Sequence, residues 1–419
     1  MEEKNKVDLE ASLKSEKSKN SLIVHLLIAT FGISAWIGIN SIFVELPLLV
    51  NSLPEKWNLP MYLVIMIQVA NIGPMAYILA RKFNFNFPES YLIFALLLLG
   101  ASMMSLLAFF YKKTLFFRGK EYSAVLFAAT FFTALVNCSS SLLFMPYLRH
   151  FRESYLASYY VGEGLSGIIP SAIALIQGTG SQCDSEKIER FSPQYYFISI
   201  FIILLFSLIA FLLLDNLELV ASEKVSENTE NVARKDENLN HKFESTLRIY
   251  FYILLGLMCL LANGFLPGIQ SFSSLPYGNI TYHLTATLSL LANPIGCFLA
   301  VFFPPKSWKI INWLSTVTFL NCSHVIYLAF VSPRPPLQYS VVGKVFVILS
   351  WILLIGLISY VKLALASIFR HEAHSGNLFR IGIVMQIGSA FGAVLSLILS
   401  SFTKLLESYD SCSEDTFPS

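Results

Sequence analysis

Long apolar stretches alternate with short polar or charged breaks along almost the whole chain. A helix needs about 20 apolar residues to cross the hydrocarbon core of a bilayer. Eleven such stretches follow one another, at residues 22–49, 59–80, 90–111, 122–147, 155–177, 195–215, 249–270, 282–303, 309–331, 341–369 and 377–401. This pattern predicts an all-α polytopic membrane protein with eleven transmembrane helices.

The composition agrees with this prediction. Hydrophobic residues make up 55% of the 419 residues and charged residues only 13%, whereas soluble domains carry about 25% charged residues. The mean hydropathy is +0.62. This much apolar surface excludes a soluble enzyme, and no basic stripe outside the short loops supports nucleic-acid binding.

The breaks divide the chain into five segments. They are a cytosolic N-terminal tail at 1–21, a first transmembrane half of six helices at 22–215, a charged cytosolic linker at 216–248, a second half of five helices at 249–401, and an extracellular C-terminal tail at 402–419. The N-terminal tail has no apolar core, so no cleavable signal peptide is expected. The linker is rich in Glu, Lys, Asn and Ser, a composition typical of flexible segments.

The distribution of basic residues predicts the orientation. Of the 29 Lys and Arg residues, 18 lie in the N-terminal tail and in the segments 81–89, 148–154, 216–248, 304–309 and 370–380. Cytosolic segments are enriched in these residues. The N-terminus is therefore placed in the cytosol, and the odd number of spans places the C-terminus outside. One cluster on the predicted outer side disagrees, and it comprises Lys112, Lys113, Arg118 and Lys120.

Two features of the predicted outer segments agree with this orientation. Asn279-Ile280-Thr281 is an N-glycosylation sequon in an outer loop. Cys183 and Cys412 both fall on the outer, oxidising side, where disulfides form. We therefore treat Asn279 as a candidate glycosylation site and the two cysteines as a candidate disulfide, whose pairing the sequence leaves open.

The two halves resemble each other in sequence. Four matches lie 220 to 223 residues apart: Leu46-Pro47 with Leu266-Pro267, Asn71 with Asn293, Arg149-His150 with Arg370-His371, and Glu163-x-x-Ser166 with Gln386-x-x-Ser389. Spans one and seven run in the same direction, so the halves are predicted to be parallel repeats of six and five helices. Carriers built this way hold their substrate near the midplane, between the halves. The alternative is a coincidence of residues that are common in membrane helices.

Ionisable residues inside a span are costly and are therefore candidates for function. Glu163 lies about 12 Å from the inner end of span five at 1.5 Å of rise per residue. It is either a site residue or a protonated side chain bonded to a neighbouring helix. Glu45, near the outer end of span one, either faces an outer vestibule or caps a broken helix. Lys362 is close enough to the inner end of its span to snorkel, which favours a structural role.

Amides are more numerous within the spans: Asn40, Gln68, Asn71, Asn137, Gln177, Asn263, Asn293, Asn321 and Gln386. Some must bond helices to one another, and for Asn321, which shares a helix face with His324, local packing is as good an explanation as a site. Trp36 with Asn40, and Gln68 with Asn71, share helix faces. A ring beside several amides suits a flat heterocycle. It suits a metal ion poorly, because no carboxylate cluster is present.

No catalytic pattern is present. The chain has no HExxH motif, no GxSxG motif with partners, no Walker A loop and no Cys/His metal spacing. The sequence therefore predicts neither an enzyme nor an ATP-driven pump, and it calls for no cofactor.

Several motifs resemble one known family. Trp36-x-x-x-Asn40-Ser41-Ile42-Phe43-Val44-Glu45-Leu46-Pro47 closely resembles the first-span motif of the animal riboflavin transporters, a solute-carrier family. The likeness continues over most of the membrane portion, in Leu53-Pro54-Glu55-x-Trp57-x-Leu59-Pro60, Asn137-Cys138-Ser139-Ser140, Phe144-Met145-Pro146-Tyr147, Gly162-Glu163-Gly164-Leu165-Ser166 and Ser359-Tyr360-Val361-Lys362.

The resemblance implies facilitated, sodium-independent uptake of riboflavin across the plasma membrane by an eleven-span carrier. Some family members carry Gln at the position of Glu163, so the family pattern does not require a charge there. The six-plus-five layout also resembles the equilibrative nucleoside transporters and major-facilitator-like carriers. We expect the chain to act as a monomer in the bilayer.

The chemistry of riboflavin fits the amides. The pyrimidine edge of its ring presents acceptor, donor and acceptor groups that Asn and Gln can match, and its faces stack on Trp. The candidate substrate-binding residues are Trp36, Asn40, Glu45, Gln68, Asn71, Asn137, Glu163, Asn263, Asn293 and Gln386. A nucleoside or nucleobase transporter is the alternative carrier, a receptor that does not transport is the alternative class, and proton coupling through Glu163 is left open.

Overall fold

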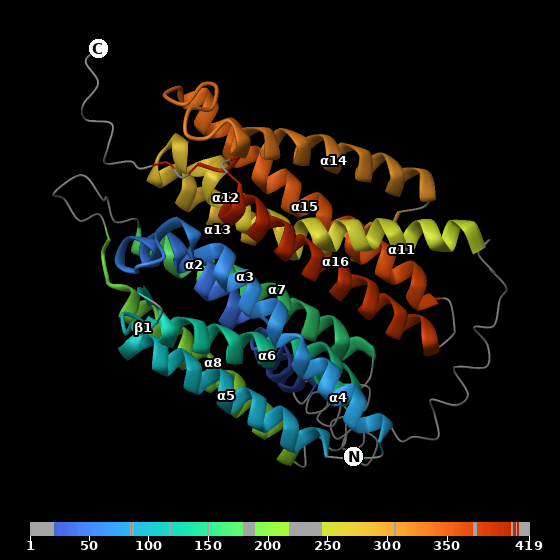
Figure 1. Ribbon diagram of the computed structural model, residues 1–419. Coiled ribbons are helices and arrows are strands. Elements are labelled where there is room, and N and C mark those ends of the chain that lie inside the picture. The colour runs from blue at the N-terminus through green and yellow to red at the C-terminus, as the bar shows by residue number, and fades with distance from the viewer. Residues whose placement is uncertain are drawn as a thin grey trace, which may run out of the picture.

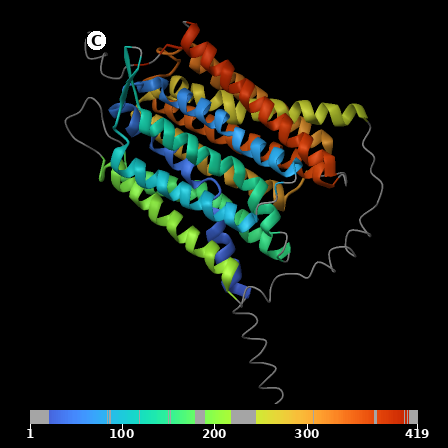
Figure 2. The same ribbon diagram turned by 60° about the horizontal axis from the view of Figure 1, so that its bottom comes forward.

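The helices of the computed structural model lie side by side along a common direction (Figures 1 and 2). The structure describes residues 21–178, 189–217 and 245–409, apart from 84, 86–87, 118, 149–150, 152, 306, 372–374, 404 and 408. Within these residues, 9 helices are long and apolar enough to span a membrane, and two bent helix pairs bring the number to 11. The predicted all-α, polytopic architecture is confirmed.

The first half holds six predicted spans, and each has a counterpart in the structure. Its elements are the helix Ser21–Ile33, α2 (Ile37–Ser52), the 3₁₀ turn η1 (Lys56–Asn58), α3 (Leu59–Ala70), α4 (Ile72–Lys82), α5 (Glu89–Phe110), β1 (Leu115–Phe117), β2 (Lys120–Tyr122), α6 (Ala124–Leu148), α7 (Glu153–Gln177) and α8 (Pro193–Asn216). The helix Ser21–Ile33 and α2 form span one, and α3 and α4 form span two.

The second half holds the other five spans. Its elements are α11 (Ser245–Cys259), the π-helical turn η2 (Leu260–Phe265), α12 (Leu266–Ser274), the 3₁₀ turn η3 (Leu275–Tyr277), α13 (Asn279–Phe302), α14 (Trp308–Phe330), α15 (Val341–His371) and α16 (Ser375–Phe402). Span seven is therefore α11, η2 and α12 in succession. This half, yellow to red, lies above the blue and green first half in Figure 1.

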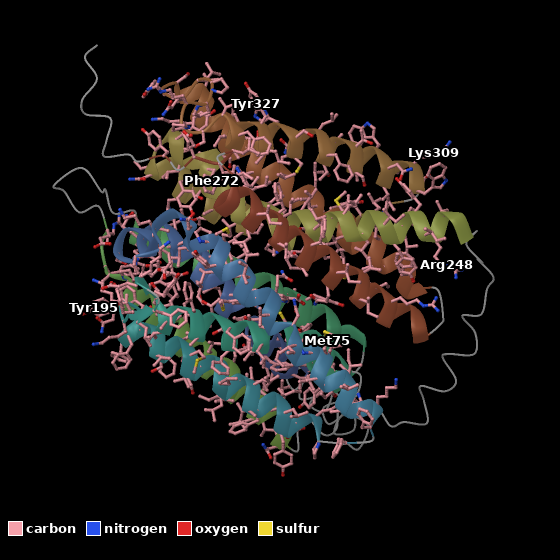
Figure 3. The ribbon with its side chains drawn as sticks, in the orientation of Figure 1. Met75, Tyr195, Arg248, Phe272, Lys309 and Tyr327 are labelled. Carbon is pink, nitrogen blue, oxygen red and sulfur yellow. The ribbon has the colours of Figure 1, made fainter. Side chains whose placement is uncertain are left out.

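The two ends of the bundle differ. At one end β1 and β2 form an antiparallel hairpin between α5 and α6, with Phe116 opposite Glu121. We call this the hairpin end, and Tyr195 lies there (Figure 3). Arg248 and Lys309 lie at the opposite end (Figure 3), which we call the linker end because α8 finishes there and α11 begins there. The sequence predicted only a basic loop where the hairpin stands.

The helix contacts repeat between the halves. Inside the first half α3 packs on α6 and α5 on α6, and inside the second half α13 packs on α15 and α14 on α15. In the first half, spans two and three thus both pack on span four. In the second half, the corresponding spans eight and nine both pack on span ten. Across the boundary α7 packs on α13 and α3 packs on α16. The repeat relates span two to span eight and span five to span eleven, so it converts the contact of α7 with α13 into that of α16 with α3. The predicted parallel repeat is therefore confirmed in the packing.

The halves are joined more closely toward the hairpin end. Span two shows this, because its hairpin-end part α3 packs on α12 and α16 of the second half whereas its linker-end part α4 packs on α6 of the first half. The Ser171 hydroxyl of α7 also donates to the main-chain oxygen of Thr287 in α13, at 3.4 Å. Side chains along α4 are well exposed, with Met75 at 69% and Leu79 at 53%. The described contacts between span two and the second half therefore lie on the hairpin-end part of that span.

Candidate functional site between the two halves

Three spans depart from regular α-helix at one level of the bundle. Span one breaks at 34–36, where its two helices meet at 51°. Span two changes from α3 to α4 at Asn71, and span seven widens into the π-helical turn η2. Irregular backbone at membrane depth is tolerated where it is buried in protein or lines a cavity, and π-helical turns are frequent at functional sites. This level is therefore where a site is expected.

The break in span one is supported by α6. The side-chain nitrogen of Asn137 donates to the main-chain oxygen of Ala35, and Asn137 is only 1% exposed. Ser34 donates to the main-chain oxygen of Phe31 at 2.6 Å. Trp36, half-buried at the end of the break, packs against the hydrophobic cluster of the first half. Asn137 thus holds the broken backbone in place, and Trp36 lies beside it.

Each half carries the same amide–hydroxyl pair. Asn40 of α2 donates through its side-chain nitrogen to the Ser166 hydroxyl of α7 at 3.3 Å. Asn263 of η2 donates in the same way to the Ser389 hydroxyl of α16 at 3.1 Å. Donor and acceptor are 126 residues apart in both pairs. The sequence repeat is therefore also a repeat of hydrogen bonds at the level of the helix breaks.

A chain of hydrogen bonds crosses from one half to the other. Asn71 donates to the side-chain oxygen of Gln68 at 3.2 Å, and Gln68 donates to the main-chain oxygen of Asn263 at 3.3 Å. Lys362 of α15 then donates through Nζ to the side-chain oxygen of Asn263 at 3.1 Å. We call Asn71, Gln68, Asn263 and Lys362 the central network. It joins three of the predicted site residues to a fourth residue that was not among them.

Lys362 makes a contact that the sequence did not predict. It was expected to snorkel toward the inner end of its span, but its amino group lies on Asn263. Ser359, one turn earlier on the same helix, donates to the side-chain oxygen of Asn293 at 2.5 Å. The Ser359–Lys362 face of α15 thus contacts two amides of the second half, Asn293 and Asn263. The one sequence signal for this contact was the presence of a lysine within a predicted span.

Glu163 and its repeat counterpart Gln386 both lie on the helices that line the boundary. The Glu163 side chain is half-buried on α7, one turn before Ser166, and no hydrogen bond or ion pair of its carboxylate exists among the described residues. The thiol of Cys297 lies within electrostatic range of both Glu163 and Lys362. Gln386 is exposed on α16. Glu163 thus stands in the first half and Lys362 in the second, and no ion pair joins them among the described residues.

Glu45 lies apart from the central network. It is 1% exposed and accepts a hydrogen bond from the side-chain nitrogen of Gln177 at 2.9 Å. Gln177 also donates to the main-chain oxygen of Phe191 at 3.1 Å. These contacts tie the hairpin-end parts of α2, α7 and the segment before α8 together.

Other predicted residues lie outside the boundary. Asn279 is the first residue of α13, next to the turn η3, so the sequon opens a helix and glycosylation stays a prediction. Asn321 donates to the main-chain oxygen of Ser350 at 2.8 Å, which packs α14 on α15. Cys183 and Cys412 lie outside the described residues.

Known proteins of one family match this chain over nearly its whole length. Residues 20–408 match the family model "Solute carrier family 52, riboflavin transporter". "Solute carrier family 52, riboflavin transporter, member 3-A" of Danio rerio is 34% identical, covering 93% of this chain and 98% of its own. Member 2 of Homo sapiens is 33% identical over 94% and 97%, and "Riboflavin transporter rft-1" of Caenorhabditis elegans is 32% identical over 94% and 100%.

Solved structures agree in fold. A mutant of the nucleoside transporter NupG matches with a TM-score of 0.54 and 13% identity, covering 90% of each chain. A bacterial homologue of the human lysosomal transporter Spinster matches with a TM-score of 0.51 and 13% identity, covering 92% of this chain and 82% of its own. The two repeated helical halves therefore have a fold of the major-facilitator-like class. Within that class, this chain belongs to solute carrier family 52, the riboflavin transporter family.

Proposed function

We propose that this protein is a facilitative, sodium-independent riboflavin transporter of the plasma membrane that works by alternating access, with its site between the two halves. The observation that carries the proposal is the central network. It places amides of both halves on one chain of hydrogen bonds, where Gln68 reaches Asn263 across the boundary. Asn and Gln side chains can match the donor and acceptor groups of a flavin ring.

The conformation supports the transport cycle. Contacts between the halves gather toward the hairpin end, so the cycle requires a second state in which that end opens and the linker end closes. Both repeats belong to one chain, so a monomer suffices to build the site. Riboflavin is the cargo, and the mechanism uses no cofactor.

The distribution of charge supports the orientation. The linker end carries the segments rich in Lys and Arg, so we place the linker end and the N-terminus in the cytosol and the hairpin end and the C-terminus outside. An epitope inserted at Gly119, in the turn of the hairpin, tests this placement. It should be labelled by antibody on intact cells, and labelling only after permeabilisation would reverse the orientation.

The transport test is uptake of labelled riboflavin into cells that express the chain, with unlabelled riboflavin, uridine and flavin mononucleotide as competitors. Saturable uptake that riboflavin alone blocks, and that persists when choline replaces sodium, is the expected result. Block by uridine would favour the nucleoside transporter. Saturable binding without uptake into vesicles would instead favour a receptor.

A further inference from the structure

We propose that the ammonium group of Lys362 binds a ring carbonyl oxygen of the transported flavin and thereby selects the pyrimidine edge of the ring. The inference deepens the proposed function and rests on it. It names a specificity-determining residue and the part of the substrate that this residue recognises.

The first argument is the lack of a counter-ion. Lys362 lies within α15, where an ionisable residue is costly and defaults to a functional role. It makes one hydrogen bond, to the side-chain oxygen of Asn263 at 3.1 Å, although an ammonium group has three donors. Among the described residues the one ion pair is Arg81 with Glu89. Lys362 therefore has donors to spare and no carboxylate to neutralise it.

The second argument comes from the repeat. The offset of 221 residues that relates Arg149-His150 to Arg370-His371, at the ends of spans four and ten, relates Ser141 to Lys362. The first half keeps its pair between Asn40 and Ser166 at 3.3 Å without any lysine at the equivalent position. The fold of the repeat thus does not require a cation there. A residue that breaks the symmetry of two equivalent halves at their boundary is better explained by what the halves bind.

The third argument is the chemistry of the central network. At one end Lys362 offers spare donors, and at the other end the side-chain oxygen of Asn71 has no hydrogen-bond donor among the described residues. A pyrimidine edge presents two carbonyl oxygens with an N–H between them. Donation from Lys362 to a carbonyl and acceptance by an amide oxygen such as that of Asn71 would complement this edge.

The position of Glu163 gives the substrate a direction. Its carboxylate belongs to α7 of the first half, where the neighbouring Gly164 packs against Phe298 of α13, and Lys362 belongs to the second half. Electron-rich carbonyl oxygens are attracted to the cation and hydroxyl donors to the carboxylate. We therefore place the ring edge against the second half and the ribityl chain against the first.

The test combines variants of the full-length carrier with altered ligands. Sulfur accepts hydrogen bonds more weakly than oxygen, so 2-thioriboflavin and 4-thioriboflavin each weaken one ring acceptor. Binding of these two compounds and of riboflavin is measured on purified protein by flavin fluorescence. The variant is Lys362→Met, and Lys344→Met is the matched control, because Lys344 lies near the start of the same helix and is exposed.

A charge-assisted hydrogen bond is worth about tenfold to a hundredfold in affinity. We expect the unaltered carrier to bind one thioriboflavin about tenfold or more weakly than riboflavin. The Lys362→Met variant should bind riboflavin about tenfold or more weakly than the unaltered carrier does. It should bind riboflavin and that thioriboflavin equally well. Lys344→Met should behave like the unaltered carrier.

Two results would overturn the inference. One is a Lys362→Met variant that keeps the preference of the unaltered carrier, and the other is equal binding of all three flavins by the unaltered carrier. If Lys362→Met does not fold, Lys362→Arg replaces it, because arginine keeps the positive charge. A well-folded Lys362→Arg carrier that no longer distinguishes riboflavin from the thioriboflavin would also count against a role for the charge. Failure of the unaltered carrier to bind riboflavin at all would instead overturn the proposed function.

Discussion

Gln68 of the first half donates through its side-chain nitrogen to the main-chain oxygen of Asn263 in the second half, 3.3 Å away. That oxygen is open to a side chain for a local reason. The residue four positions later is Pro267, which has no N–H to donate to it. A proline in span seven thus exposes the acceptor that joins the halves, and the same Leu-Pro step recurs in span one at Pro47.

Replacing Gln68 by Leu should impair transport without unfolding the carrier. The substitution keeps the approximate size of the side chain but removes the bond to Asn263 and the bond from Asn71. A hydrogen bond contributes about 1 kcal/mol net, which corresponds to about fivefold in an equilibrium constant. We expect the KM for riboflavin uptake to rise about fivefold to tenfold at unchanged surface expression.

Gln270→Leu is the matched control for that variant. Gln270 also makes a side-chain bond, to the Ser289 hydroxyl at 3.3 Å, but both residues belong to the second half. It should leave the KM close to that of the unaltered carrier. Equal effects of the two substitutions would show that the bond across the boundary has no special part in transport.

Glu163→Gln separates a proton-carrying role from a purely structural one. The carboxylate has no hydrogen-bond partner among the described residues, and Gln already stands at the equivalent position 386. If Glu163 takes up a proton during the cycle, uptake by the unaltered carrier rises as the pH falls. The variant is permanently neutral, so its uptake should be independent of pH and close to the level that the unaltered carrier reaches in acid. A variant whose uptake keeps the original pH profile would exclude the proton role.

Much of this molecule could be predicted from its sequence because membrane insertion leaves a strong signal. All eleven apolar stretches coincide with long helices or bent helix pairs, and the match of Glu163-x-x-Ser166 with Gln386-x-x-Ser389 identified the two serines that accept equivalent bonds. Apolar length and repeat offsets are properties of the chain itself, so no knowledge of packing was needed for these predictions.

The partners of individual polar residues could not be predicted in this way. Lys362 contacts Asn263 because α15 packs beside span seven, at a separation of 99 residues, and Asn137 reaches Ala35 across 102 residues. Such contacts depend on how the helices are rotated and spaced. The hairpin was missed for another reason, since strands of three residues leave almost no periodic signal.

Glu45→Ala should lower stability rather than substrate affinity. The substitution leaves the buried Gln177 side chain without its carboxylate acceptor, and an unsatisfied buried group costs about 1–3 kcal/mol. We expect a lower melting temperature in detergent and an unchanged KM for riboflavin in the protein that reaches the surface. Glu121→Ala, on the exposed hairpin, is the control and should melt like the unaltered carrier. A raised KM at normal thermal stability would return Glu45 to the substrate site.

Gly162→Ala should prevent span one from packing on α7. A methyl group at Gly162 would collide with the main-chain oxygen of Ala29, an atom that cannot move without displacing its helix. Small residues let membrane helices approach this closely, and the contact lies about two turns from the break at 34–36. We expect little carrier at the cell surface, and a lowered melting temperature for the protein that is recovered.

Gly100→Ala is the control for this variant. At Gly100 the nearest atom to an added methyl is Val136 Cγ1 at 3.7 Å, an ordinary contact, so this variant should express and transport normally. Normal surface expression of Gly162→Ala would show that the two helices can separate without loss of the fold.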